Sequence, residues 1–111
     1  MSTPAPEDDK LIVLARGALA RAEAATGASV RDGDGRTYAG APVVTRALTL
    51  TALQVAAATA LSSGARSIEA AVIVGGDGLD PGIGLVTEIS PDAYTLITDL
   101  KGSVVSKVVS R

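Results

Sequence analysis

The longest stretch without a charged side chain, residues 47–65, limits what this chain can fold into more than any other feature. The run predicts a helix from Ala47 to Ser62 with apolar side chains on nearly every face, and Gly64 ends it. Three threonines and a glutamine interrupt the run, so a buried helix explains it better than a membrane span. A helix that is apolar nearly all round belongs at the centre of a small protein or in a subunit interface.

A second helix is predicted near the start of the chain. Apolar residues recur at helical spacing over residues 10–26, and Asp8 or Asp9 can serve as the N-cap. Residues 1–9 are rich in proline and acidic side chains, and we expect them to form a mobile leader. The length fits a single domain, placed at residues 10–111.

The rest of the chain predicts strands and turns. An Asp-Gly repeat at residues 32–35 separates two short extended runs, 28–31 and 36–38, and predicts a hairpin. The remaining predicted elements are a buried strand at 68–74, a glycine-rich turn at 75–84, a weak helix at 84–89, and strands at 93–98 and 103–109 joined by a turn. This order predicts an α/β protein with a mixed sheet of five strands and helices on its faces.

The composition excludes several classes of function. The net charge is −2 and the only aromatic residues are two tyrosines. This composition predicts no basic or aromatic surface that would bind nucleic acid. No basic segment indicates a membrane surface, and no signal peptide precedes the first helix, so we expect a cytoplasmic protein. The chain has no cysteine and no histidine, which excludes a thiolate nucleophile and the usual zinc ligands. Its core must be built from aliphatic side chains such as Ala, Val, Leu and Ile, and the small ones each bury little apolar area. Because such a core is modest for a small domain, we expect the protein to self-associate.

Some polar residues have a functional and a structural interpretation. Four aspartates precede glycine or proline: Asp32, Asp34, Asp77 and Asp80. They lack the further oxygen ligands and the distal glutamate of a calcium loop, so we interpret them as turn residues. The glycines at 75–78 lack a phosphate-binding pattern and predict a flexible loop. Tyr38 and Tyr94 could stack on a base, but tyrosines in strands more often serve in packing.

The order and lengths of these elements resemble the small oligomeric type of the cytidine deaminase family. Residues 27–40, which contain Asp-Gly-Arg-Thr-Tyr-Ala-Gly, are similar to the first hairpin of that family. Residues 49–64 resemble its zinc-bearing helix, and residues 79–85 occupy the place of its Pro-Cys-x-x-Cys turn. Residues 93–109 are similar to its last antiparallel pair of strands. The resemblance covers about residues 11–109 and implies a three-layer α-β-α fold.

The same resemblance places other residues where the family has its functional groups. Thr51, Gly82 and Leu85 fall at the metal ligands, Leu53 at the proton-transferring glutamate, and Pro42 and Val44 at the residues that hold the sugar. Zinc at a catalytic site needs three protein donors, and a leucine transfers no proton. The resemblance therefore implies a member with no metal, no cofactor and no catalytic residue, in which Leu53 and Leu85 fill the vacated pocket.

The preferred interpretation is a catalytically inactive member of this fold. It would act in self-assembly, as a homotetramer or dimer packed through helices, or dock to an unidentified protein partner. The alternative is a non-catalytic module that binds a nucleoside or nucleotide, with Tyr38, Thr51, Asp77 and Asp80 as its candidate contacts. An active deaminase with an unorthodox site is the least favoured function, because it requires water activation without the usual groups. The abundance of Ala, Gly and Val resembles that of proteins from GC-rich actinobacteria.

Overall fold

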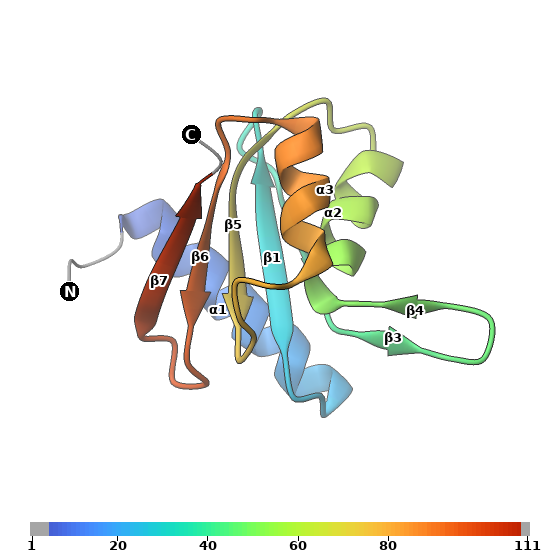
Figure 1. Ribbon diagram of the computed structural model, residues 1–111. Coiled ribbons are helices and arrows are strands. Elements are labelled where there is room, and N and C mark those ends of the chain that lie inside the picture. The colour runs from blue at the N-terminus through green and yellow to red at the C-terminus, as the bar shows by residue number, and fades with distance from the viewer. Residues whose placement is uncertain (1–4, 110–111) are drawn as a thin grey trace.

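A five-stranded sheet forms the centre of the computed structural model, which describes residues 5–109 (Figure 1). The elements in chain order are α1 (Pro6–Ala22), β1 (Gly27–Asp32), β2 (Thr37–Gly40), β3 (Val43–Val44), β4 (Thr49–Leu50), α2 (Ala52–Ser62), β5 (Ile68–Val74), α3 (Pro81–Ile89), β6 (Tyr94–Thr98) and β7 (Val104–Val109). The strands of the central sheet follow the order β2-β1-β5-β6-β7. Strands β5 and β6 are parallel and all other neighbours are antiparallel, so the sheet is mixed.

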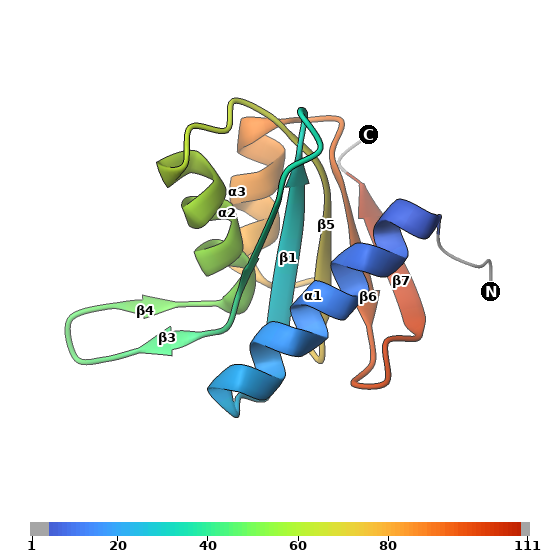
Figure 2. The ribbon, with the colours of Figure 1, turned by 180° about the vertical axis from the view of Figure 1, so that it is seen from behind.

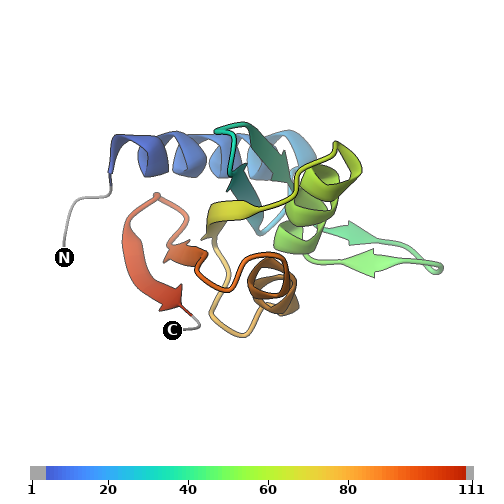
Figure 3. The same ribbon diagram turned by 90° about the horizontal axis from the view of Figure 1, so that it is seen from above.

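Helices cover both faces of this sheet and produce three layers (Figures 2 and 3). On one face, Leu11, Ile12 and Ala15 of α1 pack against the apolar residues of β5 and β6. On the other face, α2 and α3 lie side by side, and Leu53 and Val86 pack against β1 and β5. The arrangement confirms the predicted α/β class, the mixed five-stranded sheet and the α-β-α layering.

The first helix begins and ends four residues earlier than the sequence predicted. Pro6 occupies the first turn, where its fixed φ suits a helix and its missing N–H costs no hydrogen bond. The N-cap residue is Ala5, and no side chain caps the helix, so neither predicted aspartate has that role. Glu23 follows the last turn in the left-handed conformation, with φ of 52°. The expected leader overlaps the helix over residues 6–9, and its residues 1–4 lie outside the described residues.

The predicted helix at residues 47–62 begins only at Ala52, and a short hairpin precedes it. Strands β3 and β4 pair at two positions, Val43 with Leu50 and Val44 with Thr49. We call residues 43–50 the arm. The arm projects away from the sheet beside α2 (Figures 1 and 3). Its turn closes where the backbone N–H of Thr45 donates to the carbonyl of Leu48 at 2.8 Å.

The remaining elements follow the prediction more closely. Helix α3 is longer than predicted, because it begins at Pro81 instead of residue 84. The turn after β1 is stabilised by Asp32, whose Oδ1 accepts from the backbone N–H groups of Asp34 and Arg36, both at 2.9 Å. These bonds confirm the interpretation of Asp32 as a turn residue. Across the described residues, no helix is both long and apolar enough to cross a membrane.

Candidate functional site

The N-terminus of α2 is held by a reciprocal pair of hydrogen bonds. Thr51 is the N-cap residue, and its Oγ1 accepts from the backbone N–H of Gln54 at 3.1 Å. The side chain of Gln54 accepts in return from the backbone N–H of Thr51 at 2.9 Å. This capping box satisfies two donors that the first turn of a helix otherwise leaves without partners.

Asp80 connects this N-terminus to that of α3. Its Oδ1 accepts from the hydroxyl of Thr51 at 2.7 Å and from the backbone N–H of Gly82 at 2.7 Å. One carboxylate therefore lies at two helix N-termini, where the helix dipoles favour a negative charge. We call Thr51, Asp80 and Gly82 the Asp80 clip. The pair Asp80-Pro81 is a sequence signal for a helix start, because aspartate is a common N-cap and proline a common first residue.

Helices α2 and α3 approach each other closely beside this clip. A Cβ atom added to Gly82 would lie 2.7 Å from Cβ and 2.8 Å from Cγ of Leu53, and 2.9 Å from the backbone nitrogen of Gln54. Leu53 itself is fully buried. Leu85 is half-buried and packs against the same apolar cluster that contains Leu53. The space between the two helix N-termini is thus filled by apolar side chains and by backbone, and it has no room for a side chain at position 82.

Four other predicted site residues lie apart from the Asp80 clip. The hydroxyl of Tyr38 donates to Asp32 at 3.2 Å, at the turn after β1. Desolvation and then this hydrogen bond raise the pKa of the phenol. Asp77 is exposed and accepts from the backbone N–H of Leu79. Pro42 is half-buried just before the arm, and Val44, within the arm, is 76% exposed. Within residues 5–109, no hydrogen bond joins Tyr38 or Asp77 to the clip.

A polar cluster on the opposite face of the sheet was not found from the sequence. Arg31 of β1 donates to Glu69 at 2.8 and 3.1 Å and to Asp8 at 3.1 Å. The hydroxyl of Tyr94 donates to Asp8 at 2.8 Å, and the ammonium of Lys107 lies 4.5 Å from the centre of the Tyr94 ring. Glu69 reaches Arg31 because a bulge leaves it without a partner on β1, between Ala70 and Ile68.

The pKa values in this cluster follow from its hydrogen bonds. Burial alone would lower the pKa of Arg31, but the bonds with Glu69, Tyr94 and Asp8 outweigh it and hold this pKa above its ordinary value. Burial and the bond to Asp8 raise the pKa of Tyr94. Every buried polar side-chain atom in the described residues has a hydrogen-bond partner. The cluster therefore connects α1 to the sheet by hydrogen bonds and leaves no buried polar group without a partner in this part of the chain.

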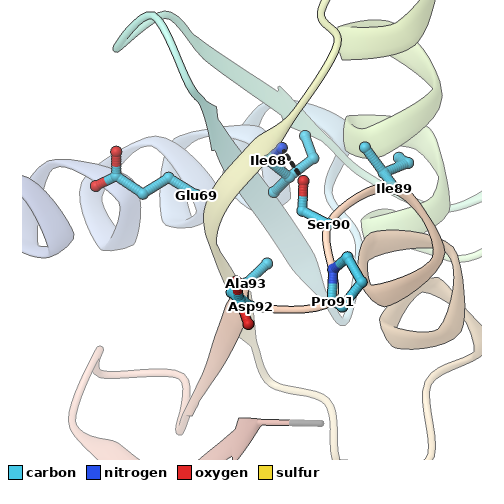
Figure 4. Close-up of a pocket in the computed structure, with 7 residues that line it drawn as sticks. All are labelled: Ile68, Glu69, Ile89, Ser90, Pro91, Asp92 and Ala93. Atoms are coloured by element: carbon cyan, nitrogen blue, oxygen red, sulfur yellow. Dashed lines mark hydrogen bonds between the residues drawn. The ribbon is translucent and has the colours of Figure 1, made fainter. Parts of the chain in front are cut away.

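A shallow hollow of about 350 Å³ lies where β5 begins and α3 ends (Figure 4). Its edge includes Glu69, Ser90 and Asp92 beside apolar residues, and the hydroxyl of Ser90 accepts from the backbone N–H of Ile68 at 2.8 Å. Among the described residues, no three His, Cys, Asp or Glu side chains are grouped closely enough to hold a metal ion. The side chains that the structure describes around this hollow therefore do not form a metal centre.

Comparisons with known proteins show which family model and which solved structures this chain matches. The model of the family described as cytidine deaminase-like matches residues 4–102. A comparison with curated protein sequences gives no significant match. Among solved structures, the chain is similar to a cytidine deaminase from Burkholderia pseudomallei, with a TM-score of 0.75 and 23% identity over 92% of this chain and 91% of that one.

Two mycobacterial structures have the same fold. The cytidine deaminase from Mycobacterium tuberculosis gives a TM-score of 0.68 and 22% identity over 78% of this chain and 81% of that one. The one from Mycobacterium leprae gives 0.65 and 22% over 80% and 86%. At this level of identity the likeness is one of fold.

Proposed function

Because this chain belongs to the cytidine deaminase-like family, we propose that it is a member without deaminase activity, which acts through protein contacts, first of all with copies of itself. The proposal depends on what occupies the N-termini of α2 and α3. The resemblance matches the zinc ligands to Thr51, Gly82 and Leu85, and the catalytic glutamate to Leu53. The chemistry and packing of these four residues support that reading.

The donor set does not fit a zinc ion. Thr51 offers a neutral hydroxyl that already donates to Asp80, Gly82 has no side chain, and Leu85 is apolar. A catalytic zinc site uses three protein donors, usually thiolate, imidazole or carboxylate.

The close approach of Gly82 to Leu53 carries the proposal. A cysteine at position 82 would need its Cβ 2.7 Å from that of Leu53, so α2 already occupies the space that a ligand side chain at this position would require. Asp80 adds a carboxylate where a nucleotide phosphate would otherwise meet two helix N-termini. Both features disfavour a return of metal chemistry and disfavour an anionic ligand at this place.

Self-assembly is supported by the surface of α2. The chain carries one charged residue, Arg46, between Pro42 and Ala65. Leu61 is 42% exposed, and Ala58 and Thr59 are exposed on the same helix. A helix that presents an uncharged surface to water is typical of one that packs against another protein.

The proposal is tested with untagged protein, because a histidine tag binds zinc. We expect no stoichiometric zinc by elemental analysis, no uridine formed from cytidine, and a molar mass above that of one chain by light scattering. Stoichiometric zinc together with turnover of cytidine would overturn the loss of activity, and a monomer at all concentrations would overturn self-assembly.

Thermal unfolding against a panel of nucleosides and nucleotides tests the alternative function. A ligand at about 100 times its dissociation constant adds about 2.7 kcal/mol of stability. In a domain of this size that is a rise in the melting temperature of about 10 °C or more. We expect no such rise, and a clear rise with one compound would support a binding module.

A further inference from the structure

Strand β7 differs from the buried strands of the central sheet in its exposure. It lies at the end of the sheet, and β6 is its one paired neighbour among the described residues (Figure 1). Four of its six residues are exposed, whereas β1, β5 and β6 are buried along most of their length. Val105 and Val109 are 56% and 49% exposed. An edge strand of this kind is a template for pairing with another extended chain.

Features that usually protect a sheet edge are nearly absent from β7. The strand contains no proline, and Lys107 is its only charged residue. The ammonium of Lys107 lies 4.5 Å from the centre of the Tyr94 ring, so this side chain leans over β6 and away from the outer edge. Within residues 5–109, no strand pairs with the outer backbone groups of β7. These groups are therefore open to a further strand.

A hollow adjoins the start of this strand. It has a volume of about 540 Å³, and its wall includes Leu100, Lys101 and Val105. Val105 is the extra residue of a bulge, because its two neighbours in β7 pair with consecutive residues of β6. Asp99 also lines the hollow, but its Oδ1 accepts from the backbone N–H groups of Lys101 and Ser103 within the turn. Domains that bind a peptide as an added strand combine an open edge with such a pocket for one side chain.

Charge distinguishes the kinds of strand that fit this edge. Residues 100–109 contain Lys101 and Lys107 and no acidic residue. The ion pairs of the described residues all involve Arg31, so neither lysine has a carboxylate partner there. A second copy of β7 would bring two more lysines to the same place, and like charges on paired strands are destabilising. An acidic strand would instead neutralise both lysines.

We propose that β7 binds an extended acidic segment of another protein, which adds to the sheet as a sixth strand. An apolar side chain of that segment lies in the hollow against Leu100 and Val105, and an acidic side chain lies beside Lys107. Main-chain hydrogen bonds supply affinity, whereas the hollow and the lysine select the side chains. The inference goes beyond the proposed self-assembly, because the partner has a different sequence and binds away from α2.

A displayed library of random twelve-residue peptides, selected on the immobilised full chain, is the first probe. We expect the enriched peptides to carry acidic residues and to alternate between apolar and polar side chains. A selection that enriches no peptide, or only peptides without acidic residues, would overturn the proposal. Enriched peptides are then synthesised with a fluorescent label, and their dissociation constants are measured by polarisation.

Backbone methylation of one enriched peptide tests whether it binds as a strand. In a strand added to a sheet edge, the N–H groups of alternate residues face the neighbouring strand and the others face solvent. We expect methylation of one alternate set of amide nitrogens to raise the dissociation constant about tenfold or more, and methylation of the other set to have little effect. Equal effects from the two sets would contradict strand addition.

Variants of the protein test the lysine and the hollow at exposed positions. We expect Lys107→Glu, which reverses the charge at the edge, to weaken binding about fivefold or more. Arg46→Glu makes the same change in the exposed arm, on the far side of the molecule, and should leave the affinity unchanged (Figure 1). Leu100→Ser, at a position that is 59% exposed, removes an apolar wall of the hollow and should also weaken binding, and Leu48→Ser in the arm is its control. Affinity that is insensitive to both Lys107→Glu and Leu100→Ser would place the peptide elsewhere and overturn the proposal.

The outcomes separate this inference from the proposed function. Light scattering of the protein alone measures self-assembly without peptide, so a failed selection leaves self-assembly standing. A monomer that binds acidic peptides and loses them on Lys107→Glu would overturn self-assembly and leave strand addition standing. If Lys107→Glu instead lowers the molar mass of the protein alone, β7 joins copies of this chain, and the foreign partner is overturned.

Discussion

Gly82 is the single residue on which the closure of the candidate site depends. Its neighbour Gly84 lies in the same helix, and a Cβ added there meets nothing within 4 Å. Alanine is a better helix former than glycine at both positions. Comparing Gly82→Ala with Gly84→Ala therefore separates the effect of packing from the effect of helix propensity. Whatever difference their substitution produces comes from Leu53 and the backbone of α2.

We expect Gly82→Ala to destabilise the protein by about 1–3 kcal/mol, as overpacking of a core does. Gly84→Ala should instead stabilise it by about 0.5–1 kcal/mol. Urea denaturation of both variants measures the difference. Equal stabilisation by the two changes would mean that α3 moves away from Leu53 at little cost, and that the site is not closed.

At the scale of elements, Asp80 is the main polar connection between α2 and α3. Asp80→Ala removes a cap from α3 and the acceptor of the Thr51 hydroxyl, so we expect a loss of about 1–2 kcal/mol of unfolding free energy. Asp77→Ala, an exposed residue in the preceding loop, should change stability by less than about 0.5 kcal/mol. A double-mutant cycle of Thr51→Val with Asp80→Ala measures the coupling between the two side chains, and a coupling energy near zero would argue against this hydrogen bond as a stabilising contact.

The sequence predicted elements whose patterns are local. The strand at 68–74 and the hairpin turn after β1 depend on an uninterrupted apolar run and on Asp-Gly pairs, and both were found where predicted. The arm was missed because residues 47–50 continue the uncharged run of α2, and hydropathy alone does not separate a short hairpin from another helical turn.

The candidate site was harder to predict, because its contacts join distant parts of the chain. That Thr51 would cap a helix could be inferred from its place before an apolar run. Its bond to Asp80 spans 29 residues, and the approach of Gly82 to Leu53 depends on how α2 and α3 pack. Tyr38 was a candidate contact, but its place in β2 brings it to Asp32 instead.

The start of α1 differs from the prediction for a related reason. Pro6 and the acidic residues after it are typical of a mobile leader, but they also suit the first turn of a helix. Tertiary contact decides between these alternatives, because Asp8 is only 5% exposed and binds Arg31 and Tyr94. No pattern near Asp8 in the sequence indicates partners that lie 23 and 86 residues away.

We expect Tyr94→Phe to weaken the contact between the start of α1 and the sheet while the sheet itself stays intact. The change removes a hydrogen bond to a buried carboxylate, which contributes about 1–2 kcal/mol. Hydrogen exchange should accelerate first in the N-terminal turn of α1 and leave β5 protected. Acceleration spread evenly over both elements would show that Tyr94 supports the whole fold instead of one helix end.

At the scale of the whole molecule, the two tyrosines connect pH to stability. The hydroxyls of Tyr38 and Tyr94 each donate to a carboxylate, that of Asp32 and that of Asp8. Burial and these bonds raise both pKa values above the ordinary value of about 10. A phenolate beside either carboxylate would place two negative charges together and lose the hydrogen bond.

The sign of the pH dependence follows from that shift. The folded state holds these protons more tightly than the unfolded state, so their contribution is fully present below about pH 10 and is lost as pH rises through the raised pKa values. Because the chain has no tryptophan, phenolate absorbance near 295 nm reports the two tyrosines directly. We expect a titration midpoint above about 10 in the folded protein, a midpoint near 10 in urea, and a fall in unfolding free energy above pH 10 that the double variant Tyr38→Phe/Tyr94→Phe reduces. Coincident midpoints in the two states would contradict the prediction, and the hydroxyl bonds would then contribute nothing to alkaline stability.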